Sequence, residues 1–307
     1  MTDTRIEIPS GDVTVVGDRY GDPADPPVVF LHGGGQTRHS WASSARDIAA
    51  AGWSTITLDL RGHGDSGWSP DGNYGLGRFA DDVVAVARFL DRPPVLVGAS
   101  LGGNAALSSL GDDPELAAGL VLVDVSPFTQ RAGTDRVKNF MAQHAETGFA
   151  ALEEAADAVA AYQPHRKRPS NLDGLRKNLR ERDGRWYWHW DPAFLRDIGA
   201  EAVQRDRHLD PVHLGAAAAS LRIPTLLVRG GESDVISIED SARFLRVVPH
   251  AEFASVGGAH HMVAGDDNAV FEDVLVDFLH RRIRNRLNVF TEAGAGATSA
   301  IGAQNAR

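Results

Sequence analysis

The stretch PVLVGASLGG at residues 94–103 decides the fold of this chain. Apolar residues lead into the pattern Gly-x-Ser-x-Gly, and an alanine-rich segment follows it at residues 104–107. This order predicts a short buried strand, a tight turn and then a helix. The two glycines have no Cβ to collide with the crossing strand and helix. In this setting the pattern is typical of a nucleophile elbow, in which the turn strains Ser100 at the positive end of a helix. The plainer interpretation is a glycine-rich turn with a capping serine.

The composition bounds the class of protein. The chain has 307 residues, of which 43% are hydrophobic and 23% are charged, as in soluble globular proteins. With 31 basic and 41 acidic residues the net charge is −10, so we expect neither nucleic acid nor a membrane as a partner. The absence of cysteine excludes disulfides, thiolate zinc sites and a cysteine nucleophile. We see no secretory signal and no apolar run of about 18 residues, and therefore expect a cytoplasmic protein.

Buried strands and amphipathic helices alternate along most of the chain, which predicts an α/β fold with a mostly parallel central sheet and helices on both faces. Ligands bind at the C-terminal ends of the strands in such sheets. The expected strands lie at residues 28–31, 55–58, 94–97, 120–123, 223–231 and 251–256, after a hairpin at 5–8 and 13–16. The expected helices lie at residues 40–51, 77–90, 237–247 and 269–284.

The alternation stops in the middle of the chain, which predicts an insertion. We assign residues 1–127 and 215–287 to the core, 128–214 to a helical cap (lid) with helices near 137–148 and 149–162, and 288–307 to a flexible tail.

An aromatic cluster in this insertion has two open interpretations. Trp186, Trp188 and Trp190 alternate with other residues, which predicts an extended segment with one aromatic face. The cluster either lines an apolar substrate pocket or anchors the cap to the sheet. Phe128 is a further candidate for the pocket.

A serine nucleophile needs a base, and the base needs an orienting acid. His260 and His261 follow the last strand in a loop of small residues, and the residues alone do not separate them. Asp234, after the strand at 223–231, is our predicted acid, and Asp124, after the strand at 120–123, is its rival.

The reaction also needs an oxyanion hole built from backbone N–H groups. Leu101, directly after the nucleophile, is expected to supply one group, and Gly34 in the loop His32-Gly33-Gly34-Gly35 the other. We interpret Asp59 and Asp65, at another strand end, as structural.

Five motifs together resemble the α/β-hydrolase superfamily over about residues 5–285. The motifs are LHGGG at 31–35, DLRGHGDS at 59–66, GASLGG at 98–103, GGESD at 230–234 and AHHM at 259–262. They are similar to the branch that holds epoxide hydrolases, dehalogenases, cofactor-free haloperoxidases, lactonases and C–C bond hydrolases. In that branch the catalytic histidine is followed by an apolar residue, which favours His261, followed by Met262, over His260. The resemblance also implies that the turn at 61–64 is structural, including His63.

The nucleophile decides the expected chemistry. Epoxide hydrolases and haloalkane dehalogenases use an aspartate where this chain has Ser100, and a serine attacks a carbonyl carbon to form an acyl-enzyme. We therefore expect a serine hydrolase of a small carboxylic ester or lactone, with no cofactor, no metal and a small-molecule substrate that carries an apolar group. Two alternatives stay open: a C–C bond hydrolase or cofactor-free perhydrolase/haloperoxidase, and a non-catalytic ligand-binding protein on the same scaffold.

Overall fold

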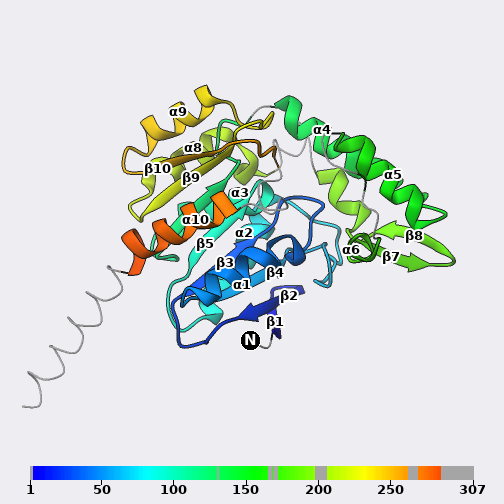
Figure 1. Cartoon of the computed structure of the whole chain (residues 1–307), viewed down its shortest axis with the longest axis horizontal. Helices are drawn as coiled ribbons and strands as arrows, with labels where there is room; N and C mark the ends of the chain where they lie inside the picture. Colours follow the sequence, from blue (N-terminus) through cyan, green and yellow to red (C-terminus); the bar gives the residue numbers. More distant parts are fainter. Residues whose placement is uncertain are drawn as a thin grey trace, which may run out of the picture.

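The computed structural model describes residues 3–129, 131–164, 168, 172–197, 206–261 and 269–284. Its centre is an eight-stranded sheet in the order β1-β2-β4-β3-β5-β6-β9-β10 (Figure 1). β1 and β2 form an antiparallel hairpin, β2 pairs antiparallel with β4, and all other neighbours are parallel. The strands are β1 (Thr4–Ser10), β2 (Val13–Tyr20), β3 (Pro27–Leu31), β4 (Ser54–Asp59), β5 (Val95–Ala99), β6 (Gly119–Val123), β9 (Thr225–Gly230) and β10 (Glu252–Val256).

Helices cover both faces of this sheet (Figure 1). One face carries α1 (Ala42–Ala50) and α10 (Ala269–Phe278). The other face carries α2 (Leu76–Phe89), α3 (Leu101–Asp112), α8 (Pro211–Ser220) and α9 (Ile238–Val247).

The apolar runs of the strands supply both layers of the core. Val29 and Leu31 of β3 belong to the cluster under α2 and α3, whereas Val28 and Phe30 belong to the cluster under α1 and α10. Successive side chains of a strand point to opposite faces, so only a strand that is apolar at every position can serve two layers. The predicted fold class is confirmed.

The predicted core elements are present with small shifts at their ends. The helix expected at 40–51 is a short 3-10 turn, η1 (Arg38–Trp41), that continues into α1. The helix expected at 269–284 is α10 followed by a π-helical turn, η5 (Leu279–Arg284).

We call the described residues between 128 and 209 the cap segment. It contains α4 (Arg131–Ala142), α5 (Leu152–Tyr162), α6 (Asp173–Arg176), the 3-10 turns η2 (Pro192–Asp197) and η3 (Arg207–Leu209), and a hairpin of β7 (Leu179–Arg182) and β8 (Arg185–Trp188). The hairpin lies with α5 and α6 at the end of the molecule away from α10 (Figure 1).

One expectation for this region is wrong. The helix predicted at 137–148 ends at Ala142, because the backbone turns with positive φ at His144 (58°) and Gly148 (62°). The predicted cap boundary at 214 falls inside α8, which packs on α3: a Cβ on Gly111 would lie 2.7 Å from the Cβ of Ala217. The division into a core and a cap stays a prediction.

Two predicted features fall wholly or partly outside the described residues, namely the tail at 288–307 and Met262. Within the described ranges, we find no helix that combines the length and the apolar character needed to span a bilayer.

Candidate active site

Ser100 stands in the turn between β5 and α3, as the sequence predicts. Its backbone has φ 46° and ψ −112°, and residues other than glycine rarely adopt a positive φ. Strain of this kind persists only where the surrounding structure fixes it, and it gathers at functional sites.

The surrounding glycines show what fixes the turn. A Cβ on Gly98 would lie 2.6 Å from backbone atoms of Gly102 and Gly103, and a Cβ on Gly102 would lie 2.6 Å from the Cβ of Leu31. The strand and the helix therefore cross at a distance that only glycine permits. Ser100 is held at the N-terminus of α3, where the helix dipole favours negative charge.

His261 meets a buried carboxylate. Its Nδ1 lies 2.7 Å from Oδ2 of Asp124, which directly follows β6 and has no exposed surface. A carboxylate only accepts, so Nδ1 carries the proton and Nε2 is left as the basic nitrogen. Asp124 also accepts the Gly230 N–H at 2.9 Å and the Ser233 hydroxyl at 2.5 Å. These donors compensate the burial of its charge.

Asp234, our predicted acid, does not take this place. Its side chain is 45% exposed and forms a 2.9 Å ion pair with Arg136. The reason lies in the loop after β9, where the guanidinium of Arg229 donates to the carbonyls of Gly231, Ser233 and Ile236. The loop is thereby coiled so that Ser233 faces the buried acid while Asp234 faces outward. Of the two histidines that the sequence left open, His261 has the contact with the carboxylate.

In the glycine loop after β3, the N–H of Gly34 has no acceptor among the residues that the structure describes. The N–H of Gly33 donates to Oε1 of Gln36 at 3.0 Å, and the N–H of Gly35 donates to Nε2 of His63 at 3.1 Å. No hydrogen-bond acceptor for the N–H of Gly34 or of Leu101 occurs within the described part of the chain. These are the two groups that the sequence predicts for an oxyanion hole.

Three buried histidines surround this loop. His32 accepts the Leu60 N–H at Nε2 (3.0 Å), and its Nδ1 lies 2.8 Å from the Gly33 carbonyl. The ring of His63 lies 5.2 Å from that of His32 and 5.7 Å from that of His189. Burial lowers the pKa of His32 to about 4 and that of His63 to about 3, and it lowers the pKa of His189 well below its usual value.

This histidine cluster is not built for a metal, because the ring nitrogens face backbone groups. Over the described ranges, no group of three or more histidine, aspartate or glutamate side chains is arranged to hold an ion.

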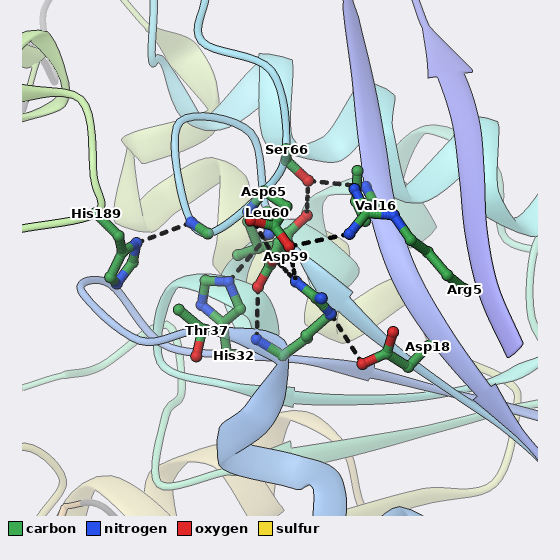
Figure 2. A network of polar contacts seen from close by, with 12 residues as sticks. Arg5, Val16, Asp18, His32, Thr37, Asp59, Leu60, Asp65, Ser66 and His189 are labelled. Carbon is green, nitrogen blue, oxygen red and sulfur yellow. Dashed lines mark hydrogen bonds and ion pairs between the residues drawn. The ribbon is translucent and has the colours of Figure 1, made fainter. Parts of the chain in front are cut away.

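Asp59 joins the segment after the glycine loop to the loop at 60–66, in the structural role that we expected. It has no exposed surface, accepts the backbone N–H of Arg38 at 2.7 Å and pairs with the Arg38 guanidinium. It also accepts the N–H of Asp65 at 2.9 Å. Figure 2 shows this network around Asp59, with His32 and His189 on the side of the glycine loop.

Apolar residues of the cap segment cover the glycine loop. A Cβ on Gly34 would lie 3.7 Å from Sδ of Met141 in α4 and 3.8 Å from the ring of Phe194 in η2. The sequence reading missed Phe194, which stands in a short irregular turn without helical or strand periodicity.

The aromatic cluster is extended, as predicted, since Trp186 and Trp188 lie in β8. Trp188 and Trp190 are buried and stacked with centroids 4.8 Å apart, whereas Trp186 is half-buried. The two buried rings thus pack against each other inside the cap segment, and both interpretations of the cluster stay predictions. Phe128, half-buried, lies 3.8 Å beneath the guanidinium of Arg243.

Comparisons with known proteins agree with the fold. Esterase Rv0045c of Mycobacterium tuberculosis is 35% identical over 238 residues, which cover 76% of this chain and 74% of that protein. The sn-1-specific diacylglycerol lipase ABHD11 of Mus musculus is 29% identical over 275 residues, which cover 84% of this chain and 82% of the lipase. A crystal structure of esterase Rv0045c superposes with a TM-score of 0.70 at 29% identity, over 91% of this chain and 92% of that chain. A family model described as alpha/beta hydrolase fold matches residues 26–267, and the chain therefore belongs to that family.

Proposed function

We propose that the protein is a serine hydrolase that cleaves a small carboxylic ester or lactone, with Ser100 as nucleophile, His261 as base and Asp124 as acid. The observation that carries the proposal is the 2.7 Å contact between His261 Nδ1 and the buried Asp124 carboxylate. That contact leaves Nε2 as the imidazole nitrogen that would take a serine proton, and Ser100 stands in a strained elbow of the kind used by such nucleophiles. The named activities of the two relatives, an esterase and a diacylglycerol lipase, support the same reaction class.

The proposed reaction runs through two half-reactions. Ser100 Oγ attacks the carbonyl carbon of the substrate while its proton passes to His261 Nε2. The N–H groups of Gly34 and Leu101 stabilise the oxyanion, and His261 then protonates the leaving alkoxide. A water molecule attacks the acyl-enzyme while His261 Nε2 takes its proton. Collapse of the second oxyanion breaks the bond to Ser100 Oγ and releases the acid, and the proton on His261 passes to Oγ to restore the serine.

The surroundings of Gly34 support an apolar group next to the scissile carbonyl. Met141 and Phe194 lie within van der Waals distance of the position that a Cβ on Gly34 would occupy. A sulfur and an aromatic ring favour an acyl or alkyl chain over a charged group.

Labelling with a fluorophosphonate followed by intact-protein mass spectrometry tests the nucleophile. We expect one label per wild-type chain and none on Ser100→Ala. No label on folded wild-type protein would overturn the proposal and favour a binding protein. A chain-length series of p-nitrophenyl esters, with a set of lactones, tests the substrate class. Labelling without any ester or lactone turnover would overturn that class.

The acid is tested with a matched pair of variants. Asp124→Asn should lower kcat by about 10⁴-fold, as loss of the orienting aspartate does in other triads. Asp234→Asn, the control at the exposed site, should keep kcat near the wild-type value. The reverse result would show that the assignment of the acid is wrong.

A further inference from the structure

His189 of the cap segment reaches the glycine loop of the core. The residue follows β8 and is 1% exposed. Its Nδ1 accepts the N–H of Gly64 at 2.8 Å, and its Nε2 lies 3.3 Å from the carbonyl oxygen of Gly35. Because the Gly64 N–H can only donate, the proton must sit on Nε2, which donates to Gly35. Figure 2 shows His189 entering this region from the cap segment.

Gly35 is thereby held at both of its backbone groups. Its N–H donates to Nε2 of His63 at 3.1 Å, while its carbonyl accepts from His189. His63 is oriented in turn by its Nδ1, which lies 3.0 Å from the Arg61 carbonyl. Gly35 has φ 75°, so the loop reverses at a residue with no side chain of its own to fix it.

The neighbouring residue carries the group that matters for the chemistry. Gly34 precedes Gly35, and the orientation of its N–H depends on how the loop is held on either side. On the upstream side Gly33 is held through its N–H by Gln36 and through its carbonyl by His32. On the downstream side the contacts are those of His63 and His189. Of the four residues, only His189 comes from the cap segment.

We infer that His189 is a positioning residue, through which the cap segment sets the aim of the Gly34 N–H at the oxyanion. The inference rests on the proposed function, since it assumes that the oxyanion forms at Ser100. It adds that the cap segment takes part in transition-state stabilisation, besides covering the site.

The cap segment stays attached when the bond between His189 and Gly35 is removed, because other bonds hold it on the neighbouring loop at 60–66. Arg180 donates to the Gly64 carbonyl at 2.5 Å and to Asp65 at 2.9 Å. The N–H of Asp191 donates to the Gly62 carbonyl at 2.8 Å. A variant at residue 189 therefore tests the orientation of the Gly34 N–H, and not the attachment of the cap segment.

Two substitutions separate the two bonds of the imidazole. His189→Asn places an amide oxygen where Nδ1 stands, which keeps an acceptor for Gly64 but removes the donor to Gly35. His189→Gln places an amide NH₂ near the position of Nε2, which keeps the donor to Gly35. His208→Asn is the matched control, since His208 bonds Ser108 at 2.6 Å on the α3 side of the core, outside the glycine loop.

We expect His189→Asn to lower kcat about tenfold with KM within twofold of wild type, because loss of a whole oxyanion donor costs about 10²- to 10³-fold and a misaimed one costs less. His189→Gln and His208→Asn should keep kcat within about threefold. The affinity of a trifluoromethyl ketone should fall in parallel with kcat/KM in His189→Asn, while inhibition by the product alcohol is unchanged. All rates are counted per site titrated with fluorophosphonate.

Three results would overturn the inference. The first is a wild-type kcat per titrated site in His189→Asn, and the second is an equal loss in His189→Gln. The third, measured on the wild-type protein and independent of any variant's folding, is a ¹⁵N spectrum that puts the His189 proton on Nδ1. Absence of labelling on wild-type protein would instead refute the proposed function, and the inference with it.

Discussion

Acidification should destabilise this protein before its carboxyl groups titrate, because imidazoles that are buried and neutral in the native state bind protons once the chain unfolds. His32 and His63 have no exposed surface, and burial lowers the pKa of His32 to about 4 and that of His63 to about 3. In the unfolded chain the same groups have a pKa of about 6.5. Below that value the unfolded state binds protons that the native state does not, so stability rises with pH and falls on acidification.

The magnitude follows from these values. At pH 5 each unfolded imidazole is protonated while the native one is still neutral, and the gap of about 1.5 pH units corresponds to about 2 kcal/mol per histidine. Two such groups remove about 4 kcal/mol between pH 7 and pH 5, a large part of a typical stability of about 5–15 kcal/mol. The loss for His32 continues to about pH 4, where its native form begins to protonate.

Urea unfolding at constant ionic strength, at pH 7, 6 and 5, measures this loss. His63→Gln should reduce the pH dependence over this range by about 2 kcal/mol, whatever its effect on stability at pH 7. The surface variant His250→Gln is the control and should keep the wild-type dependence. A free energy of unfolding that is flat from pH 7 to pH 5 would refute the reasoning, because it would mean that the imidazoles are hydrated or charged in the native state.

Three further substitutions test the packing around the site. Gly98→Ala should lower the free energy of unfolding in urea by at least about 3 kcal/mol, because the new Cβ would lie 2.6 Å from backbone atoms. Its control is Gly215→Ala in α8, where nothing lies within 4 Å of the new Cβ, and this variant should be neutral or stabilising. Arg61→Met should cost about 3–5 kcal/mol, since Arg61 donates to both oxygens of the buried Asp82 carboxylate at 2.7 and 2.8 Å; an unchanged unfolding midpoint would contradict that account. Ser233→Ala removes a 2.5 Å donor to the proposed acid and should lower kcat by up to about tenfold with little change in Tm; a kcat equal to wild type would show that the backbone donor alone suffices.

The sequence predicted the structure best where the local pattern fits only one tertiary environment. The apolar run that became β3 is buried at every position, and a run of that kind fits only a strand covered on both faces. The glycines of the elbow at Gly98 and Gly102 were equally predictable, because the turn itself brings the strand and the helix too close for a Cβ.

The partner of His261 could not be chosen from the sequence, because two aspartates follow neighbouring strands. What separates Asp124 from Asp234 is the shape of the loop after β9, and three bonds from Arg229 set that shape. No local pattern encodes those bonds. The strand β7 was missed for a related reason, since its sequence LRER has only one buried residue and takes its conformation from pairing with β8.

The role inferred for His189 lay beyond sequence reasoning. Its neighbours mark it as part of an aromatic cluster, and nothing along the chain connects it to Gly35. The contact exists because Asp191 and Arg180 fix this part of the cap segment on the loop at 60–66.

The position of Asp124 has a consequence for how such chains can diverge. Ser100 and Asp124 follow Ala99 and Val123, which are paired across β5 and β6. The proposed nucleophile and the proposed acid therefore belong to one strand–helix–strand unit, which is complete before the cap segment begins. An acid after β9 would have the whole insertion between itself and the nucleophile. In the present arrangement both residues of the pair precede the cap segment, so a change of length within that segment leaves the stretch of chain that joins them unaltered.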